Sequence, residues 1–519
     1  MLAALLVALL VALLSLAVPA TAGPAHPAWL DATGRPNASA RDALRLLAEA
    51  AADGFAPQDY RAAELAQQAA ALNAAPAAEG PAQPAFERDL SSAMRHYLHH
   101  LHLGRIDPRT LGFRVVRPDA AAPDIAALLQ AAVAAGRLPL LAAELRPRLG
   151  QYGKLREALA RYRASAADGS LGHLPALAPT KRGEADGGAA ALHRLLVALG
   201  DLPADAPPPS ERDPNADDAA LAEGIRRFQQ RHDLAADGVI GRATLAALNV
   251  PLAHRVQQLE LALERLRWLP DLGAQPFIGI NIPMFRLWAW DPAAPETASI
   301  SMRVVVGRAL NTQTPVLLES TRYIVFRPYW HLPRSIVRNE VLPAVARDPG
   351  YLQRNEMEIV RGGGDDAQVV AATSENLAAL REGGLRQRQR PGTKNSLGLV
   401  KFIFPNNANV YLHDTPATQL FGRARRDLSH GCVRVEDPVT LAHWVLKDQP
   451  GWTRETIQGA MAGTSPLRVD LTRPLPVILF YMTAMAMPAD QQLYLADDIY
   501  GHDTKLARAL ARRRVVTAF

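Results

Sequence analysis

The spacing of apolar residues changes near residue 270, and that change limits the folds open to this chain. Before residue 270, alanine and leucine recur at helical spacing between proline and glycine breakers. Helices are therefore expected at Arg41–Ala52, Asp59–Leu72, Phe86–Leu103, Ala120–Ala135, Leu155–Ala167, Ala190–Leu199, Ala219–His232, Arg242–Leu248 and Arg255–Trp268. After residue 270, β-branched and aromatic runs predict strands at Phe277–Pro283, Phe285–Trp290, Ile300–Gly307, Tyr323–Pro328, Leu399–Ile403 and Asn409–Leu412.

A chain of 519 residues is long enough for several domains. We expect a multidomain α and α+β protein, in which a helical scaffold domain and a small three-helix domain precede a β-rich mixed-sheet domain. The polar, glycine-rich sequence of residues 335–391 interrupts the β-rich part and is expected to form a capping insertion over a site. The expected parts are a signal peptide at 1–22, the scaffold at 23–175, the three-helix domain at 186–250 and the β-rich domain at 255–519.

The N-terminal segment is typical of a secretory signal peptide. Leu2–Val18 is an apolar run, and the small residues of Pro19–Gly23 follow it as a cleavage pattern. No Lys or Arg precedes Arg35, so either the true start lies upstream or the signal is atypical. An uncleaved membrane anchor is the alternative, although the apolar run is at the short end of the spanning range. We expect an exported protein of the periplasm or cell envelope, in contact with a membrane only if this segment is retained.

Charge and motifs exclude several classes of function. The formal charge of +6 is spread over the whole chain without a dense Lys/Arg run, so nucleic acid is not an expected partner. The sequence contains no phosphate-binding loop, dinucleotide fingerprint, zinc-protease motif or paired cysteines. No nucleotide or metal cofactor is therefore implied.

Cys432, the only cysteine, is expected to be a nucleophile. A lone cysteine often fills a core as a small apolar residue. Here, however, it follows His430 and Gly431, precedes Arg434, and lies nineteen positions after His413. An imidazole within reach can generate the reactive thiolate, and an exported protein gains nothing from a stray oxidisable thiol.

The residues beside Cys432 suggest how it could act on a carbonyl. The backbone N–H groups of Gly431 and Cys432 could stabilise an oxyanion. Arg434 would share a face with Cys432 in an extended segment, where its guanidinium could bind a substrate carboxylate or form a structural salt bridge with Glu436.

The stretch from Ile225 to Leu245 resembles the small peptidoglycan-binding module. It has a helix that ends near Phe228-Gln229, an Asp237-Gly238 turn, and a short helix that begins with Gly241 and Thr244. The proline-rich passage from Leu202 to Asp218 departs from the compact module. Whether this part binds glycan or is a helical spacer therefore stays open.

The region around Cys432 resembles the catalytic domain of the L,D-transpeptidases, and the likeness extends over nearly the whole mature chain. His413 is followed, after fifteen intervening residues, by the run from Ser429 to Val435. Further matching segments point to the large, multidomain subfamily: Glu264–Trp268, Val304–Gly307, Thr314-Pro315, Pro328–Pro333, Asn395–Gly398 and Tyr411–Pro416.

The resemblance implies cysteine acyl transfer on peptidoglycan stem peptides. In that family the cysteine attacks the carbonyl of the third residue of a donor stem, and the terminal D-alanine leaves. The side-chain amine of a diamino acid, usually meso-diaminopimelate, on an acceptor stem then resolves the thioester and cross-links two third residues. The resemblance also implies acylation by carbapenems, and other wall-synthesis enzymes are possible partners.

Carried over residue by residue, Cys432 is the nucleophile and His413 is the base. The backbone carbonyl of Asp414 would fix the imidazole tautomer. His430 is expected to orient the loop or the substrate. Ser429, Tyr411 and Trp330 are also candidate substrate-binding residues, although for Tyr411 and Trp330, as for Tyr329, filling the β core is the favoured interpretation.

Two other functions remain open on the sequence alone. A cysteine hydrolase acting on wall peptides would use the same residues and differ only in whether water or an amine attacks the thioester. A non-catalytic, peptidoglycan-binding scaffold is the third interpretation. It is disfavoured because Cys432, His413, Gly431 and Arg434 are all present.

Overall fold

The structure is a computed structural model that describes residues 28–74, 80–115, 123–168, 171, 188–208, 219–270, 275–293, 300–310, 312–486 and 492–517. The expected signal peptide lies outside the described residues. The chain divides into two compact units, of which the first comprises residues up to 104 together with 120–147, and the second comprises the remainder. Within the described residues, no helix has the length and apolarity to cross a membrane.

The first unit is helical. Its helices are α1 (Ala38–Ala48), α2 (Ala62–Ala74), α3 (Ala82–Leu103), α4 (Ile125–Ala134) and α5 (Leu138–Leu145). Asn37 and Asp124 cap α1 and α4 by accepting hydrogen bonds from the free N–H groups of the first turn. Helix α5 was not predicted, because its two turns are shorter than the periodic pattern that sequence analysis needs.

The second unit begins with five helices: α6 (Gly150–Ala167), α7 (Ala189–Leu199), α8 (Ala219–Arg231), α9 (Arg242–Leu248) and α10 (Leu252–Leu266). Residues of α6 share one apolar cluster with α7, α8 and α10. The scaffold boundary expected at residue 175 therefore differs from the division of the structure, which places α6 in the second unit.

The side chain of Gln229 holds the three-helix part together. Its amide nitrogen donates to Asp237 Oδ1, the Val239 carbonyl and Thr244 Oγ1 at 2.8–3.1 Å, and its amide oxygen accepts from Gly238 N–H at 2.9 Å. The residues that carry the resemblance to the peptidoglycan-binding module thus bind one another.

The β-rich part is one nine-stranded sheet in the order β11-β3-β12-β10-β9-β4-β13-β1-β2. Strand β2 also pairs with the first half of β3, which closes the sheet into a barrel. The strands are β1 (Phe277–Asn281), β2 (Arg286–Trp290), β3 (Ile300–Gly307), β4 (Leu317–Phe326), β9 (Val400–Ile403), β10 (Leu412–His413), β11 (Asp427–Ser429), β12 (Val433–Val435) and β13 (Leu467–Phe480). The expected α and α+β architecture is confirmed.

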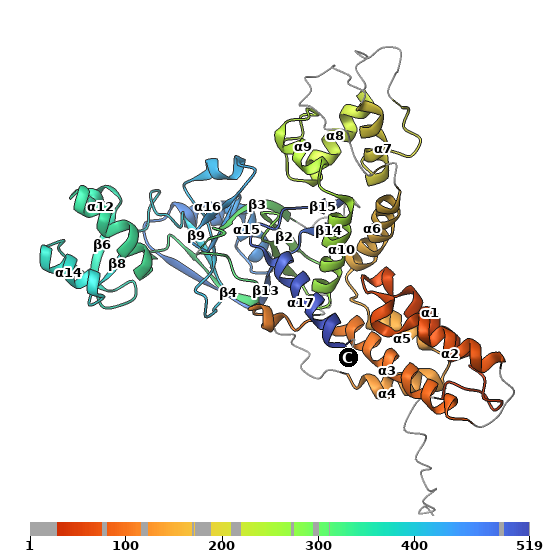
Figure 1. Ribbon diagram of the computed structural model, residues 1–519. Coiled ribbons are helices and arrows are strands. Elements are labelled where there is room, and N and C mark those ends of the chain that lie inside the picture. The colour runs from red at the N-terminus through yellow and green to blue at the C-terminus, as the bar shows by residue number, and fades with distance from the viewer. Residues whose placement is uncertain are drawn as a thin grey trace, which may run out of the picture. The chain divides into compact units, whose positions relative to one another are not determined.

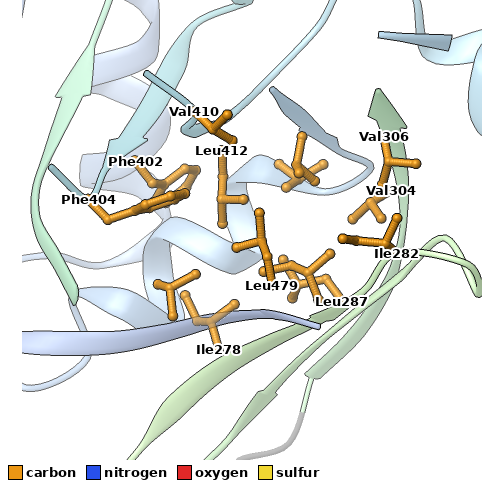
Figure 2. Close-up of a cluster of buried hydrophobic side chains, with 14 of the residues drawn as sticks. Ile278, Ile282, Leu287, Val304, Val306, Phe402, Phe404, Val410, Leu412 and Leu479 are labelled. Carbon is orange, nitrogen blue, oxygen red and sulfur yellow. The ribbon is translucent and has the colours of Figure 1, made fainter. Parts of the chain in front are cut away.

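One face of these strands encloses the main apolar core. Figure 2 shows side chains from β1, β2, β3, β9, β10 and β13 converging there, among them Leu412 and Val304. Strand β13 pairs with β4 from Leu467 onward, with a register shift between Asp470 and Leu475.

The capping insertion has a sheet and an apolar core of its own. Strand β5 (Trp330–His331) begins it, and β8 (Arg386–Gln389) is the central partner in the order β5-β8-β6-β7. The remaining elements are α11 (Arg334–Ile336), a π-helical turn at Val337–Val341, α12 (Leu342–Arg347), α13 (Tyr351–Arg354), β6 (Met357–Arg361), β7 (Gln368–Val370) and α14 (Ser374–Glu382), several of which Figure 1 labels. This sheet was missed because β8 consists of polar residues.

The chain after β12 adds a further layer of helices and a hairpin. These elements are α15 (Pro438–Val445), α16 (Arg454–Ala462), the hairpin of β14 (Ala484–Ala486) and β15 (Leu493–Leu495), and α17 (His502–Thr517). Tyr500, just before α17, returns to the β domain, where its ring contributes to the main core.

Candidate active site

The register of two short strands brings the predicted site residues together. β10 and β12 run parallel, with Leu412 opposite Val433 and His413 opposite Arg434. Leu412 and Val433 are fully buried in the core. Because side chains alternate along a strand, His413 and Arg434 lie on the opposite face of the sheet. Tyr411 and Cys432 each come directly before one of these core residues, so their side chains lie on the same face as His413 and Arg434.

The backbone carbonyl of Asp414 fixes the tautomer of the His413 imidazole. Its Nδ1 lies 2.5 Å from the Asp414 carbonyl, which accepts the ring N–H and leaves Nε2 as the basic nitrogen. Burial, and next the positive charge of Arg434, lower the pKa of His413 to about 3. The ring is therefore unprotonated throughout the neutral pH range.

The side chain of Asp414 has a supporting role. Its carboxylate accepts Leu399 N–H at 2.8 Å and Thr415 N–H at 2.7 Å, and burial raises its pKa. Gly398, with φ of 62°, packs so closely that an added Cβ would lie 2.3 Å from this carboxyl group. The carboxylate thus fixes the loop that presents the Asp414 carbonyl.

The Cys432 thiol is neutral in the resting site. Burial raises its pKa, while hydrogen bonding to Tyr411 and the charge of Arg434 act in the opposite direction. Its sulfur contacts the Asn409 carbonyl at 3.8 Å. Among the described residues, no hydrogen bond joins Cys432 Sγ to His413. The structure therefore places the thiol and imidazole on one face without a preformed ion pair.

The loop before Cys432 changes the roles expected for Ser429 and Gly431. The Ser429 hydroxyl accepts Gly431 N–H at 3.2 Å and donates to the Cys432 carbonyl at 2.5 Å. Gly431 has φ of 114°, a conformation that favours glycine. Ser429 thus holds the loop rather than facing a substrate. Within the described chain, the N–H of Cys432 has no acceptor, whereas that of Gly431 already has one.

Thr314 is a positioning residue that sequence reasoning missed. Its hydroxyl accepts Gly307 N–H and donates to the Gly431 carbonyl, each at 2.8 Å. Tyr500 donates to the Gly307 carbonyl and accepts Thr314 N–H. An added Cβ at Gly307 would lie 2.0 Å from the Thr312 carbonyl. The Val304–Gly307 and Thr314-Pro315 motifs could have signalled this function, since both are close to the nucleophile loop.

Comparison with known proteins identifies the domain that carries this site. Residues 275–465 match the family profile of the L,D-transpeptidase catalytic domain. This part of the chain is similar to the catalytic domain of the L,D-transpeptidases. Residues 23–159 match a scaffold domain, and residues 188–248 match a peptidoglycan-binding domain described as putative. The expected resemblance to the multidomain L,D-transpeptidases is thereby confirmed.

A curated relative supports the same assignment. A Haemophilus influenzae protein named "Putative L,D-transpeptidase" is 31% identical over 250 residues, which is 48% of this chain and 49% of the relative. The match thus spans about half of the relative's length.

Arg434 of the matched domain does not form the salt bridge considered from the sequence. Glu436 is occupied by Arg303, whose Nε lies 2.8 Å from its carboxylate. Among the described residues, the buried Nε of Arg434 has no hydrogen-bond partner. Burial lowers the pKa of Arg434, and the nearby Cys432 opposes this effect. The guanidinium is therefore available to an anion at the site.

The two aromatic candidates connect the nucleophile to the cap. Tyr411 is a hydrogen-bonding neighbour of both Cys432 and Trp330, and burial raises its pKa well above the usual range. Trp330 packs against the apolar cluster of the cap. Neither ring belongs to the main β core, and the Trp330 ring packs in the apolar cluster of the cap instead.

His430 forms a second connection to the cap. Its Nε2 lies 2.6 Å from Glu340 Oε1 in the π-helical turn. The His430 ring is thus bound to the cap. This position agrees with an orienting role for the loop rather than with proton transfer at Cys432.

Lys401 is a second residue of the site face that the sequence analysis did not select. It lies in β9 directly opposite His413 of β10. The strand predicted at Leu399–Ile403 could have indicated it, because Lys401 lies between apolar neighbours that face the core. No group of three or more His, Cys, Asp or Glu side chains suited to a metal occurs in the described part of the chain.

Proposed function

We propose that this protein is a peptidoglycan L,D-transpeptidase that cross-links stem peptides through a thioester on Cys432. The observation that carries the proposal is the shared face of β10 and β12. This face presents Cys432 beside His413, and the Asp414 carbonyl fixes the tautomer of the imidazole. The arrangement occurs within a domain of the matching family.

In the first half-reaction, His413 Nε2 accepts the thiol proton as Cys432 Sγ attacks the carbonyl of the third donor residue. The carbonyl oxygen becomes an oxyanion, to which Cys432 N–H is free to donate. The C–N bond to the terminal D-alanine then breaks. His413 returns the proton to the leaving amine, and a thioester remains.

In the second half-reaction, the side-chain amine of an acceptor diamino acid attacks the thioester. His413 takes a proton from the attacking nitrogen and gives it to the departing sulfur. A new amide bond joins two third residues, and Cys432 is restored as a thiol. No external reductant, oxidant or metal is required for either step.

The position of the cap favours an amine acceptor over water. Trp330 approaches Tyr411 beside the nucleophile, and Glu340 binds His430 on the nucleophile loop. A covered site of this kind protects a reactive thioester from water. Hydrolysis of the same thioester is the second candidate, and it differs only in the product.

The helical domains suggest where the enzyme acts. The family match of residues 188–248 supports a peptidoglycan-binding role, although the Gln229 network shows that its motif residues build the fold. Wall material as substrate also supports export through the N-terminal segment, to the periplasm or cell envelope.

The test is incubation of the purified chain with disaccharide-tetrapeptides, followed by mass spectrometry of the products. We expect a dimer with loss of D-alanine, and no dimer with Cys432→Ala. Disaccharide-tripeptide without dimer, in the presence of acceptor stems, would instead establish the hydrolase. No turnover by the folded wild-type chain would favour a binding scaffold.

A further inference from the structure

Lys401 and Arg434 flank the catalytic histidine on the site face. In the antiparallel pair of β9 and β10, Lys401 lies directly opposite His413, and in the parallel pair of β10 and β12, Arg434 lies opposite the same residue. Directly opposed residues point to the same side of a sheet. Their neighbours Phe402, Leu412 and Val433 fill the core on the other side.

The ammonium group of Lys401 lacks a carboxylate partner among the described residues. Within the part of the chain that the structure describes, this group has one hydrogen bond, to the Tyr329 carbonyl at 3.5 Å. Burial lowers the pKa of Lys401, and the more distant Asp365 opposes this only by its charge. A half-buried cation without a partner carries a desolvation cost that an anionic ligand would offset.

The spacing of the strands limits which ligand can reach Lys401. Neighbouring strands lie about 4.8 Å apart, so β9 and β12 are separated by roughly 10 Å. A donor whose reacting carbonyl is at Cys432 would therefore extend across His413 to place another group at Lys401. The third residue of the stem, a diamino dicarboxylic acid, carries its second carboxylate at the far end of its side chain.

We propose that Lys401 forms a subsite for the side-chain carboxylate of the third donor residue. This proposal rests on the proposed function, because it deepens the same reaction. Lys401 acts in substrate selection: a diamino dicarboxylic acid is bound by its free carboxylate, while a diamino acid without that carboxylate leaves the ammonium group unpaired. Arg434, nearer to Cys432, remains available for a carboxylate on the other side of His413.

The experiment compares two donors that differ in one group. The wild-type chain, Lys401→Met and Lys401→Arg are each incubated with a diaminopimelate tetrapeptide and with its side-chain amidated form. Acylation of Cys432 is followed by intact-mass spectrometry, which requires no acceptor. We expect the wild type to prefer the free carboxylate about tenfold to a hundredfold in kcat/KM, as is typical of a charged hydrogen bond.

The variants separate binding from structure. Lys401→Met is expected to lose this preference, while its rate of acylation by the amidated donor stays within about threefold of the wild-type rate. Lys401→Arg is expected to retain part of the preference. The subsite would be overturned if the variants lost acylation rate equally with both donors. It would also be overturned if the wild type were acylated equally fast by both donors. Acylation by neither donor would overturn the proposed function and the subsite with it. Melting temperature and iodoacetamide labelling of Cys432 verify that each variant is folded.

Discussion

The Thr314 hydroxyl donates a 2.8 Å hydrogen bond to the Gly431 carbonyl and so fixes the peptide plane directly before the nucleophile. Rotation of that plane would redirect the N–H of Cys432, because the carbonyl of Gly431 and this N–H belong to the same peptide group. Thr314 therefore positions the proposed oxyanion donor without contacting substrate.

Thr314→Val is expected to lower kcat for acylation by about tenfold to a hundredfold, because misdirecting a preorganised donor weakens oxyanion stabilisation. The KM should change little, since Thr314 does not line the substrate face. Thr314→Ser retains the hydroxyl and is the matched control. A larger loss of rate in Thr314→Ser than in Thr314→Val would show that the methyl group, rather than the hydrogen bond, is what matters.

Cys432 is expected to be acylated by a carbapenem, because a site thiol that accepts acyl donors opens the strained ring and retains the product. Intact-mass spectrometry should show one adduct per wild-type chain and none with Cys432→Ala. An adduct that persists in Cys432→Ala would place the nucleophile elsewhere.

Replacement of His413 by Ala is expected to slow acylation by about 10²- to 10⁴-fold, the usual contribution of a general base. The matched control is His430→Asn, since His430 binds Glu340 of the cap and lies outside the proton path. Its effect on the rate should be at least tenfold smaller. If His430→Asn were the more damaging change, the two histidines would have to exchange roles.

The pH dependence of iodoacetamide labelling tests the resting protonation state. Burial raises the pKa of Cys432, and the pKa of His413 lies at about 3. The unliganded thiol should therefore gain reactivity only as the pH rises above the ordinary range of a cysteine, without a step near the usual pKa of histidine. A plateau of full reactivity at neutral pH would contradict the neutral pair and indicate a preformed thiolate.

The main elements of the site could be predicted because their chemistry is local. The run from Ser429 to Arg434 and the position of His413 predict a nucleophile with a nearby imidazole from residue types and spacing, and the family resemblance adds the role of His413 as base. The strands Ile300–Gly307 and Leu399–Ile403 were also predictable, since apolar and β-branched residues dominate them.

The missed residues depend on contacts that the sequence does not encode locally. Thr314 acts through Gly431, which is 117 positions away, and Lys401 reaches the site only through the register of β9 with β10. The cap strand β8 escaped prediction because tertiary partners stabilise its polar side chains, as when Arg388 binds Glu358 at 2.9 Å. Contacts between residues far apart in the sequence place these residues and this strand, and the strand propensity of the local sequence does not.

The most direct test of the account is to trap the acyl-enzyme. The full chain is mixed with a disaccharide-tetrapeptide donor, without acceptor, and its intact mass and peptide map are recorded within seconds. The account predicts an added disaccharide-tripeptide acyl group on Cys432, released by hydroxylamine, with one equivalent of D-alanine in solution. D-alanine release by a wild-type chain that never carries this group, or equal release by Cys432→Ala, would contradict it.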